Sequence, residues 1–362
     1  MSQLIKNSDH VIHLGSSAWS QLNEQISQGQ WSTIFVLTDQ ASRQFCLPIF
    51  EQHINKANFK VLSIPQGEGS KSIEWTQKLW EKLAQSGADR KSLVINLGGG
   101  VVTDIGGFVA STFRRGIDFI NIPTTLLAMV DAAIGGKTGI DLGVLKNQIG
   151  VVAQPKAIFI FPVFLETLPT RELASGWMEM VKHGFISNDE YLHECLITPK
   201  REHKNLAALI WKSVQIKNEV VSQDPFEHGR RKTLNFGHTL GHAVESYCLD
   251  HYPENYIKHG EAIGIGMILA LYLSYITQGF PKDKLMKHCV SLTQMFPNYQ
   301  FDRKAQNTII DYLKHDKKNT HGRVNFVLLK DVGQYVLDCQ INKEQIYAAF
   351  DFWQQNTTAK SD

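Results

Sequence analysis

The sequence lacks the paired cysteines of disulfide-rich proteins and the excess of one charge that is typical of proteins that bind nucleic acid or anionic membranes. Its five cysteines, Cys46, Cys195, Cys248, Cys289 and Cys339, are scattered over 362 residues without Cys-x2-Cys spacing. They favour buried or incidental thiols in a reducing compartment over a disulfide framework. The 37 basic and 35 acidic side chains give a formal net charge of only +2. Such a balance gives no reason to expect nucleic acid or an anionic membrane as a partner.

Long hydrophobic runs are also lacking. The most apolar stretch, residues 262–276, is shorter than the roughly 20 residues that a membrane span needs and directly follows the polar His259-Gly260-Glu261. The N-terminus has no apolar run beside a cleavage-type site. We therefore expect a buried core helix at 262–276, no membrane association and a cytoplasmic location.

The apolar residues that are present divide the chain into two regions. Continuous β-rich runs at residues 33–38, 61–64, 92–96, 119–122 and 157–161 are typical of parallel strands covered on both faces. Trp75, Leu79, Trp80 and Leu83 form a helical stripe between them that ends at Gly87. After Pro162 helical patterns dominate, with one late strand expected at 323–329 and a frayed tail at 354–362. The pattern predicts an α/β domain over 1–165, with a parallel sheet and dinucleotide-binding loops, and an all-α, metal-binding domain over 166–362.

Four loops follow the predicted strands. Gly98-Gly99-Gly100-Val-Val-Thr-Asp104 is the most glycine-rich of them. It does not match the Gly-x-Gly-x2-Gly fingerprint, and by itself a tight strand–helix turn explains it equally well. The other three loops are Thr38-Asp39, Pro65 to Lys71 and Pro123-Thr124-Thr125. Four such loops at the carboxyl ends of strands favour a dinucleotide site.

The segment Asn235-Phe-Gly-His238-Thr-Leu-Gly-His242 predicts a metal site. Two imidazoles four residues apart share one face of a helix, and His259-Gly-Glu follows shortly after. Most of the 14 histidines need no metal, and a lone His-x3-His pair would favour that explanation. The flanking glycines and a separate Glu179-x2-Lys182-His183 element favour a divalent ion such as zinc.

Cations gather in a segment of small residues, Gly135-Gly136-Lys137 followed by Lys146-Asn147. Each cation taken alone is most simply a solvated surface residue. Together with Arg115, Lys182, Lys217 and Arg231, however, these side chains would form a concentrated positive cluster. The cluster predicts a small, multiply charged anionic substrate.

From about residue 30 to 330 the chain resembles the 3-dehydroquinate synthase family, within the sugar-phosphate cyclase group. Nine ordered motifs carry the resemblance: Gly-Gly-Gly-Val-Val-x-Asp from Gly98, Arg115-Gly, Pro-Thr-Thr-Leu-Leu-Ala from Pro123, Gly-Gly-Lys-Thr-Gly from Gly135, Lys-Asn-x-Ile-Gly from Lys146, Glu-x-Val-Lys-His-Gly from Glu179, Leu-Asn-Phe-Gly-His-Thr-x-Gly-His from Leu234, His-Gly-Glu from His259, and Asp316-Lys317-Lys318. The chain departs from the usual pattern at Thr103, Leu145, Gln148 and Met178, none of which is a charged group.

The resemblance implies specific roles for these residues. The zinc ligands, with cobalt as an alternative ion, would be Glu179, His238 and His259. Catalytic and substrate-binding positions would be His242, Lys137, Asn147, Lys182, Asp131, Lys146, Lys217, Arg231, Asn235 and either Lys317 or Lys318. NAD would contact Asp39, Glu68, Lys71, Gly99, Gly100, Val101, Asp104, Thr124 and Thr125. Arg115 would contact the phosphate of the substrate bound in the neighbouring subunit of a homodimer.

The resemblance further implies conversion of 3-deoxy-D-arabino-heptulosonate 7-phosphate to 3-dehydroquinate and phosphate, by transient oxidation with NAD, elimination, re-reduction and aldol cyclisation. His242 would move protons on the face of the helix that also carries a zinc ligand. The alternatives are another sugar-phosphate cyclase and an NAD- and metal-dependent polyol dehydrogenase. A non-catalytic metal-binding protein would leave the ordered motifs unexplained.

Overall fold

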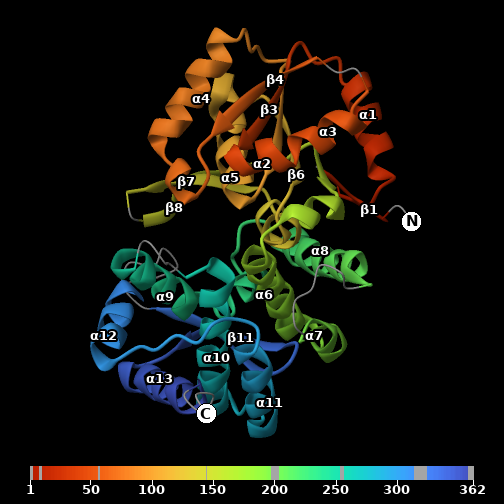
Figure 1. The fold of residues 1–362 in the computed structure, drawn as a ribbon. Helices are drawn as coiled ribbons and strands as arrows, with labels where there is room; N and C mark the ends of the chain where they lie inside the picture. Colours follow the sequence, from red (N-terminus) through yellow and green to blue (C-terminus); the bar gives the residue numbers. More distant parts are fainter. Residues whose placement is uncertain are drawn as a thin grey trace. The chain divides into compact units, whose positions relative to one another are not determined.

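In a computed structural model the chain forms two compact units, Met1–Pro169 and Thr170–Asp362 (Figure 1). The structure describes residues 3–7, 10–55, 58–143, 145–196, 204–252, 257–313 and 324–357. The predicted phosphate contact at Lys317 or Lys318 lies outside these residues.

The N-terminal unit is built on a seven-stranded sheet of order β1-β2-β9-β6-β5-β3-β4. The strands are β1 (Gln3–Lys6), β2 (Val11–Leu14), β3 (Ile34–Asp39), β4 (Phe59–Ile64), β5 (Leu93–Gly98), β6 (Asp118–Pro123) and β9 (Ala157–Ile160). All neighbouring strands are parallel except the β1–β2 pair. All five strands expected from the apolar runs are present, and every residue of the central β5 is buried. The predicted parallel sheet is confirmed, with the short strands β1 and β2 in addition.

Strand order creates a switch point between β3 and β5. The chain passes from β3 to β4 on one side and then returns across β3 to β5, after which β6 lies on the other side. In open α/β sheets, ligands bind outside the carboxyl ends of strands at such a point. The loops containing Asp39 and Gly99 flank it.

Helices connect the strands of this unit. They are α1 (Ala18–Gln28), α2 (Gln40–Phe45), α3 (Leu47–His53), α4 (Ile73–Gln85) and α5 (Gly100–Thr112), with the short helical turns η1 (Glu68–Ser70), η2 (Phe113–Arg115), η3 (Ala128–Ala132) and η4 (Pro162–Thr167). The stripe predicted on α4 packs on the sheet core with Leu79 and Leu83, and the helix ends two residues before Gly87, whose φ of +79° suits glycine.

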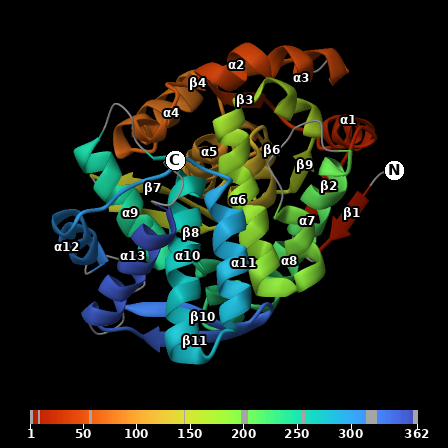
Figure 2. The same ribbon diagram turned by 60° about the horizontal axis from the view of Figure 1, so that its bottom comes forward.

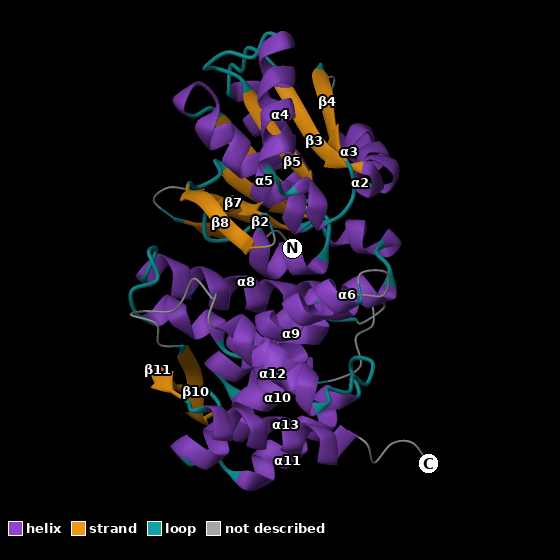
Figure 3. Cartoon of the chain, turned by 90° about the vertical axis from the view of Figure 1, so that its left-hand side faces the viewer, coloured by secondary structure: helices purple, strands orange, loops and turns teal. Residues whose placement is uncertain are grey.

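The cation-rich segment forms a hairpin that the sequence pattern did not predict. Its strands β7 (Lys137–Leu142) and β8 (Leu145–Val152) pair antiparallel in a sheet of their own, visible in Figure 3 apart from the main sheet. The hairpin packs against α5. It places Lys146 and Asn147 at the start of β8.

The C-terminal unit is helical, as predicted. Its helices are α6 (Thr170–Ser187), α7 (Asp189–Cys195), α8 (Leu206–Gln223), α9 (His238–His251), α10 (His259–Gln278), α11 (Lys282–Thr293), α12 (Arg303–Tyr312) and α13 (Lys343–Thr357), with the turn η5 (Arg230–Asn235). The late strand is present as β10 (Asn325–Asp331), and it pairs with an additional strand, β11 (Gln334–Gln340). The frayed tail predicted from residue 354 is wrong as far as Thr357, because α13 continues to that residue.

Helix α10 forms the centre of this unit. It packs against α6, α9, α11, α13 and β10, and Figure 2 shows it surrounded by several of these elements. At 20 residues it is longer than the sequence suggested, and by length and composition alone it could cross a membrane. Because 78% of its apolar window is buried within the protein, it is the core helix predicted for residues 262–276.

Candidate metal and cofactor sites

Four side chains from three helices of the C-terminal unit converge. Glu179 lies on α6, His238 and His242 lie on α9, and His259 is the first residue of α10. Glu179 Oε1 lies 3.6 Å from His238 Nε2 and 3.5 Å from His259 Nε2. Ligand atoms of the three histidines also lie within 4.8 Å of one another. The structure therefore brings together the residues that the sequence marked as a metal site.

Glycines allow the helices to approach closely enough for this convergence. A Cβ at Gly266 on α10 would lie 2.0 Å from the carbonyl oxygen of Gly237, at the start of α9. A Cβ at Gly260 would lie 2.1 Å from the carbonyl oxygen of Ser175 on α6. The backbones of α6, α9 and α10 are thus in contact around the histidines, and any side chain at these positions would separate them.

The second ring nitrogen of two of the histidines has its own partner. His238 Nδ1 lies 3.2 Å from the carbonyl oxygen of Phe236, and His259 Nδ1 lies 3.4 Å from Glu245 Oε2. Both partners accept hydrogen bonds, so both rings carry a proton on Nδ1, and Nε2 is the nitrogen of each ring that can bind an ion beside Glu179 Oε1.

Charge at this site favours a cation. Glu179 and Glu245 are both buried, and Lys182 lies in contact with Glu179 Oε2. Burial by itself lowers the pKa of His259, but the carboxylates of Glu245 and Glu179 raise it to about 10. The carboxylates thus create a potential that holds positive charge at the position where the Nε2 atoms and Glu179 Oε1 meet.

The donor set fits zinc. Donor atoms at about 2.0–2.1 Å from a tetrahedral ion lie about 3.4 Å apart, close to the 3.5 and 3.6 Å separations observed here. One carboxylate and two imidazoles would leave a coordination position for water or substrate. His242 is near enough to be an alternative ligand: its ring centroid lies 5.1 Å from that of His238 and 5.7 Å from that of His259.

Three more cations predicted at the site are buried in the same unit. Lys182 on α6 is 1% exposed, Lys217 on α8 is 6% exposed and Arg231 on η5 is 3% exposed, and the three elements contact one another. Arg231 donates to the carbonyl oxygen of Pro225 over 2.6 Å. Lys182 is already paired with Glu179, and the burial of all three side chains differs from the solvated surface position that a cation usually takes. Asn235 donates to Glu227 over 2.6 Å.

In the N-terminal unit the residues predicted to bind NAD lie at the carboxyl ends of the parallel strands. Gly99 is the N-cap of α5, and Gly100 and Val101 open that helix, where free backbone N–H groups and the helix dipole favour a pyrophosphate. Glycine is required nearby because a Cβ at Gly98 would lie 2.5 Å from the Val102 side chain. Thr124 and Thr125 directly follow β6. Asp39 ends β3 and caps α2 through a 2.7 Å bond from the Ser42 N–H.

Lys71 joins the expected cofactor loop to the hairpin. Its ammonium lies 2.9 Å from Asp104 and 3.5 Å from Glu68, and it donates to the side-chain oxygen of Asn147 on β8. Burial lowers the pKa of Lys71, but Asp104, Glu68 and Asp141 outweigh burial and hold it well above its usual range. A permanently charged lysine therefore holds together residues predicted to contact NAD and one, Asn147, predicted to contact the substrate.

The remaining predicted residues of this unit lie on exposed or half-buried positions. Lys137 is exposed at the start of β7, and Asp131 is half-buried on η3. Arg115 is exposed with a φ of +69°, directly after Arg114 at +51°. Two consecutive non-glycine residues at positive φ are unusual and strain the turn that presents Arg115.

Glu261 secures the start of α10 and does not take part in the cluster of histidines. Both of its carboxylate oxygens are bound by Arg171, at 2.6 and 2.8 Å, and it accepts from Tyr299 at 2.8 Å. It also accepts from the Lys258 N–H at 2.9 Å, which completes the N-terminal cap of α10. The His-Gly-Glu motif thus contributes one site residue, His259, and one residue that secures the helix on which His259 lies. The sequence prediction missed Glu245, although it falls three residues after His242, on the same face of α9.

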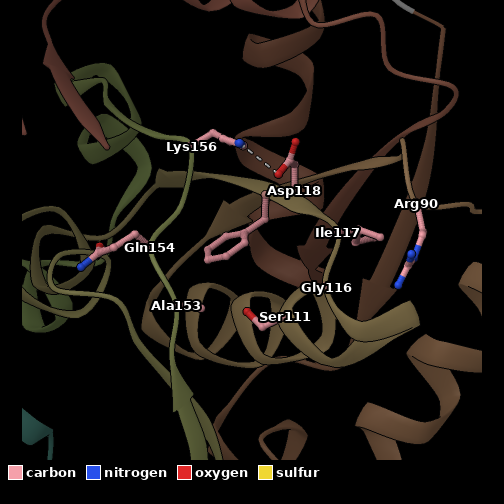
Figure 4. A pocket seen from close by; sticks show the side chains of 9 residues that line it. Arg90, Ser111, Gly116, Ile117, Asp118, Ala153, Gln154 and Lys156 are labelled. Atoms are coloured by element: carbon pink, nitrogen blue, oxygen red, sulfur yellow. Dashed lines mark ion pairs between the residues drawn. The ribbon is translucent and has the colours of Figure 1, made fainter. Parts of the chain in front are cut away.

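A cavity of about 280 Å³ lies elsewhere in the N-terminal unit. It is formed beside the amino end of β6 by Gly116, Asp118 and Phe119 together with Arg90, Ser111, Gln154 and Lys156 among others. Figure 4 shows the ion pair between the lining residues Lys156 and Asp118, whose charged atoms lie 3.4 Å apart. The predicted NAD residues lie at the opposite, carboxyl ends of the strands, so this cavity is separate from the expected cofactor site.

Two family models match consecutive parts of the chain. The model described as 3-dehydroquinate synthase N-terminal matches residues 61–175, and that described as 3-dehydroquinate synthase C-terminal matches residues 176–319. A 3-dehydroquinate synthase of Parabacteroides distasonis is 39% identical over 93% of this chain and 96% of its own length. One of Leptospira interrogans is 38% identical over 95% and 96%.

Solved structures share the fold at lower identity. A 2-deoxy-scyllo-inosose synthase complexed with carbaglucose-6-phosphate, NAD+ and Co2+ superposes with a TM-score of 0.83 at 23% identity, covering 97% of this chain and 99% of that one. A 2-epi-5-epi-valiolone synthase from Streptomyces hygroscopicus with NAD+ and Zn2+ bound gives 0.81 at 23% identity, over 98% and 99%. An NADH-dependent butanol dehydrogenase from Thermotoga maritima gives 0.65 at 13% identity, over 97% and 98%.

Proposed function

The chain belongs to the 3-dehydroquinate synthase family, and we propose that Glu179, His238 and His259 form the metal centre with which it carries out that family's reaction. It is a phosphorus–oxygen lyase that converts 3-deoxy-D-arabino-heptulosonate 7-phosphate to 3-dehydroquinate and phosphate in the shikimate pathway, with NAD and a divalent zinc or cobalt ion as cofactors. The observation that carries the residue assignment is the convergence of Glu179 Oε1 with two Nε2 atoms at 3.5 and 3.6 Å.

The cofactors supply chemistry that protein side chains lack. NAD accepts and returns a hydride, and zinc lowers the pKa of a bound hydroxyl and polarises a carbonyl. Gly99, Gly100 and Val101 at the start of α5 bind the pyrophosphate, with Asp39 and Thr124 at the adjoining strand ends. The Lys71 cluster secures the loop beside them.

The proton-handling residue is His242. It lies one turn after His238 on α9, and its ring is next to those of two ligands. If those ligands held a divalent ion, an imidazole at this distance would be able to exchange a proton with a substrate oxygen. Lys182, next to Glu179, would stabilise negative charge that develops on that oxygen.

Recognition of the substrate is divided by charge. Arg231 and Lys217, both buried on neighbouring elements, bind the carboxylate, with Asn235 beside Arg231 on η5. Lys137, Lys146 and Asn147 on the β7–β8 hairpin bind the phosphate. This division distinguishes the family's substrate from a neutral polyol, which would have no use for two cationic groups.

The assay is phosphate release from the heptulosonate phosphate by the purified chain with NAD+ and zinc. Phosphate and 3-dehydroquinate should form in equal amounts without net NADH, because the hydride is returned in each turnover. Sustained growth of NADH absorbance that matches product formation would instead identify a dehydrogenase. Turnover of other sugar phosphates, but not of this one, would identify a sister cyclase.

The protein acts as a homodimer in the cytoplasm, with Arg115 completing the phosphate site of the second subunit. Two features support this proposal: the exposed, strained turn that presents Arg115, and the eight-residue strand β8, which among the described residues pairs only with β7 and which exposes Ile149, Val151 and Val152. A free edge with apolar side chains is a surface that a second strand can cover.

Complementation tests the dimer. An Arg115→Ala chain and a His242→Ala chain are each expected to be inactive, whereas the co-expressed heterodimer regains one complete site, because the His242→Ala chain still has Arg115. Absence of recovered activity in a confirmed heterodimer would show that Arg115 does not serve the partner.

A further inference from the structure

We propose that Glu245 is a positioning residue of the metal centre, which orients His259 and raises the affinity of the site for zinc. The inference rests on the proposed function, because it takes His259 as a ligand. Glu245 Oε2 lies 3.4 Å from His259 Nδ1, on the side of the ring opposite the Nε2 atom that faces Glu179.

The hydrogen bond fixes the tautomer of His259. A carboxylate only accepts, so His259 Nδ1 must carry a proton, and Nε2 is left as the nitrogen that binds the ion in exchange for its own proton. A histidine ligand whose other nitrogen donates to a carboxylate is a better electron donor than one that donates to a neutral group. His238 provides the internal comparison, because its Nδ1 faces the neutral carbonyl of Phe236 at 3.2 Å. The two histidines are therefore unequal ligands.

Glu245 links two helices, because it lies on α9 and contacts His259 on α10. It lies on α9, seven residues after His238 and three after His242, so that all three share one face. His259 belongs to α10, and Gly266 and Gly241 let the two helices touch. Glu245 therefore holds the first residue of α10 at a fixed distance from the ligand on α9.

Burial gives a second reason to expect a functional role. Glu245 is 5% exposed, and a buried carboxylate is costly unless a positive group compensates it. Glu179, on the other side of the His259 ring, is fully buried and is already in contact with Lys182. A divalent ion bound by His259 would add positive charge that Glu245 meets through the imidazole, so metal binding and Glu245 would stabilise each other.

The experiment measures zinc binding directly. The full chain and its Glu245→Ala and Glu245→Gln variants are stripped of metal, and the zinc dissociation constant is obtained by competition with a chromophoric chelator. Cobalt-substituted samples report ligand geometry through their visible spectrum, and calorimetry reports NAD+ binding by the other unit. Glu219→Gln, an exposed position on α8 paired with Arg230, is the matched control.

We expect Glu245→Ala to raise the zinc dissociation constant about 10- to 100-fold and to shift the cobalt spectrum, with NAD+ binding unchanged. Glu245→Gln keeps an acceptor without the charge, so its zinc affinity should fall between Glu245→Ala and the unsubstituted chain. The zinc dissociation constant of the Glu219→Gln control should remain within about twofold of that of the unsubstituted chain. If Glu245→Ala does not fold, the result for Glu245→Gln decides.

Zinc affinity within about twofold of the unsubstituted chain and an unaltered cobalt spectrum would overturn the inference. A lower melting temperature of the metal-free variant with unchanged zinc affinity would do the same, because it would show a purely structural ion pair. If the unsubstituted chain releases phosphate and binds zinc, and Glu245→Ala binds zinc with the same affinity, only this inference fails. If the unsubstituted chain takes up no zinc, the metal assignment fails as well.

Discussion

The two units assemble their functional residues in different ways. In the N-terminal unit the expected cofactor residues lie on loops that directly follow β3, β5 and β6, so neighbouring strands bring them together. In the C-terminal unit, Glu179, His238 and His259 come from three helices and meet because glycines allow the backbones to touch. The comparison teaches that a loop site can be altered without loss of the fold, whereas a site between close-packed helices depends on the same contacts as the fold.

Removing one metal ligand should have the largest effect on activity. It should abolish zinc binding by the C-terminal unit and leave NAD+ binding by the N-terminal unit unchanged. His238→Ala is expected to lose bound zinc and to lower kcat about 1,000-fold, since several kcal/mol of charge stabilisation disappear. NAD+ affinity, which depends on the other unit, should stay the same. Elemental analysis and calorimetry measure the two quantities, and His251→Ala on the same helix is the control. Stoichiometric zinc in the His238→Ala protein would disprove the ligand assignment.

Acid should destabilise the helical unit through His288 on α11. This side chain is 4% exposed and packs edge-on against Phe185 at 5.2 Å, and burial lowers its pKa to about 4. Lys287 and Lys284 also lower this pKa, and Asp189 and Asp331 raise it.

Because the folded pKa lies below the ordinary value near 6.5, the unfolded chain takes up the proton more readily. The contribution of neutral His288 to the free energy of unfolding is therefore fully present above pH 6.5. It is lost as pH falls toward 4, by about 3 kcal/mol in total. Urea unfolding of the unsubstituted chain and of His288→Leu at pH 7, 5 and 4 should show a shallower pH dependence in the variant. Parallel curves would exclude His288 as the cause.

A methyl group at the crossing of α9 and α10 tests whether site and fold are inseparable in the C-terminal unit. The added Cβ in Gly266→Ala would lie 2.0 Å from a backbone oxygen, so the helices must move apart. We expect a loss of about 2 kcal/mol in stability together with weaker zinc binding. Gly69→Ala, where a Cβ meets nothing within 4 Å, is the control for stability. Weaker zinc binding without destabilisation would contradict the comparison.

The corresponding change in the N-terminal unit should be milder. Gly99 has a φ of −74°, which alanine can adopt, and its Cβ would lie 3.0 Å from the Thr125 methyl group. Gly99→Ala is therefore expected to keep its thermal stability and zinc content and to bind NAD+ about tenfold more weakly, a difference of about 1.4 kcal/mol. Calorimetry with NAD+ measures the change. An unaltered affinity would place the pyrophosphate away from this loop.

The sequence by itself determined the parallel sheet and the positions of its loops. Continuous apolar runs specify strands buried on both faces, and a parallel strand order places the loops containing Asp39, Gly99 and Thr124 at one edge. It also placed His238 and His242 on one helical face, because a separation of four residues fixes that geometry within a single helix. These features depend on local periodicity and on the direction of the chain.

Only the tertiary structure decided the features that depend on distant segments. The hairpin β7–β8 was not predicted, because β8 is exposed along most of its length and so has no alternation of apolar and polar residues. Glu261 and Glu245 are both acidic residues near His259, yet Glu261 binds Arg171 on α6 and Glu245 binds the imidazole. Sequence spacing does not separate these two roles, because the close packing of α6, α9 and α10 at Gly260 and Gly266 determines which side chain each carboxylate meets.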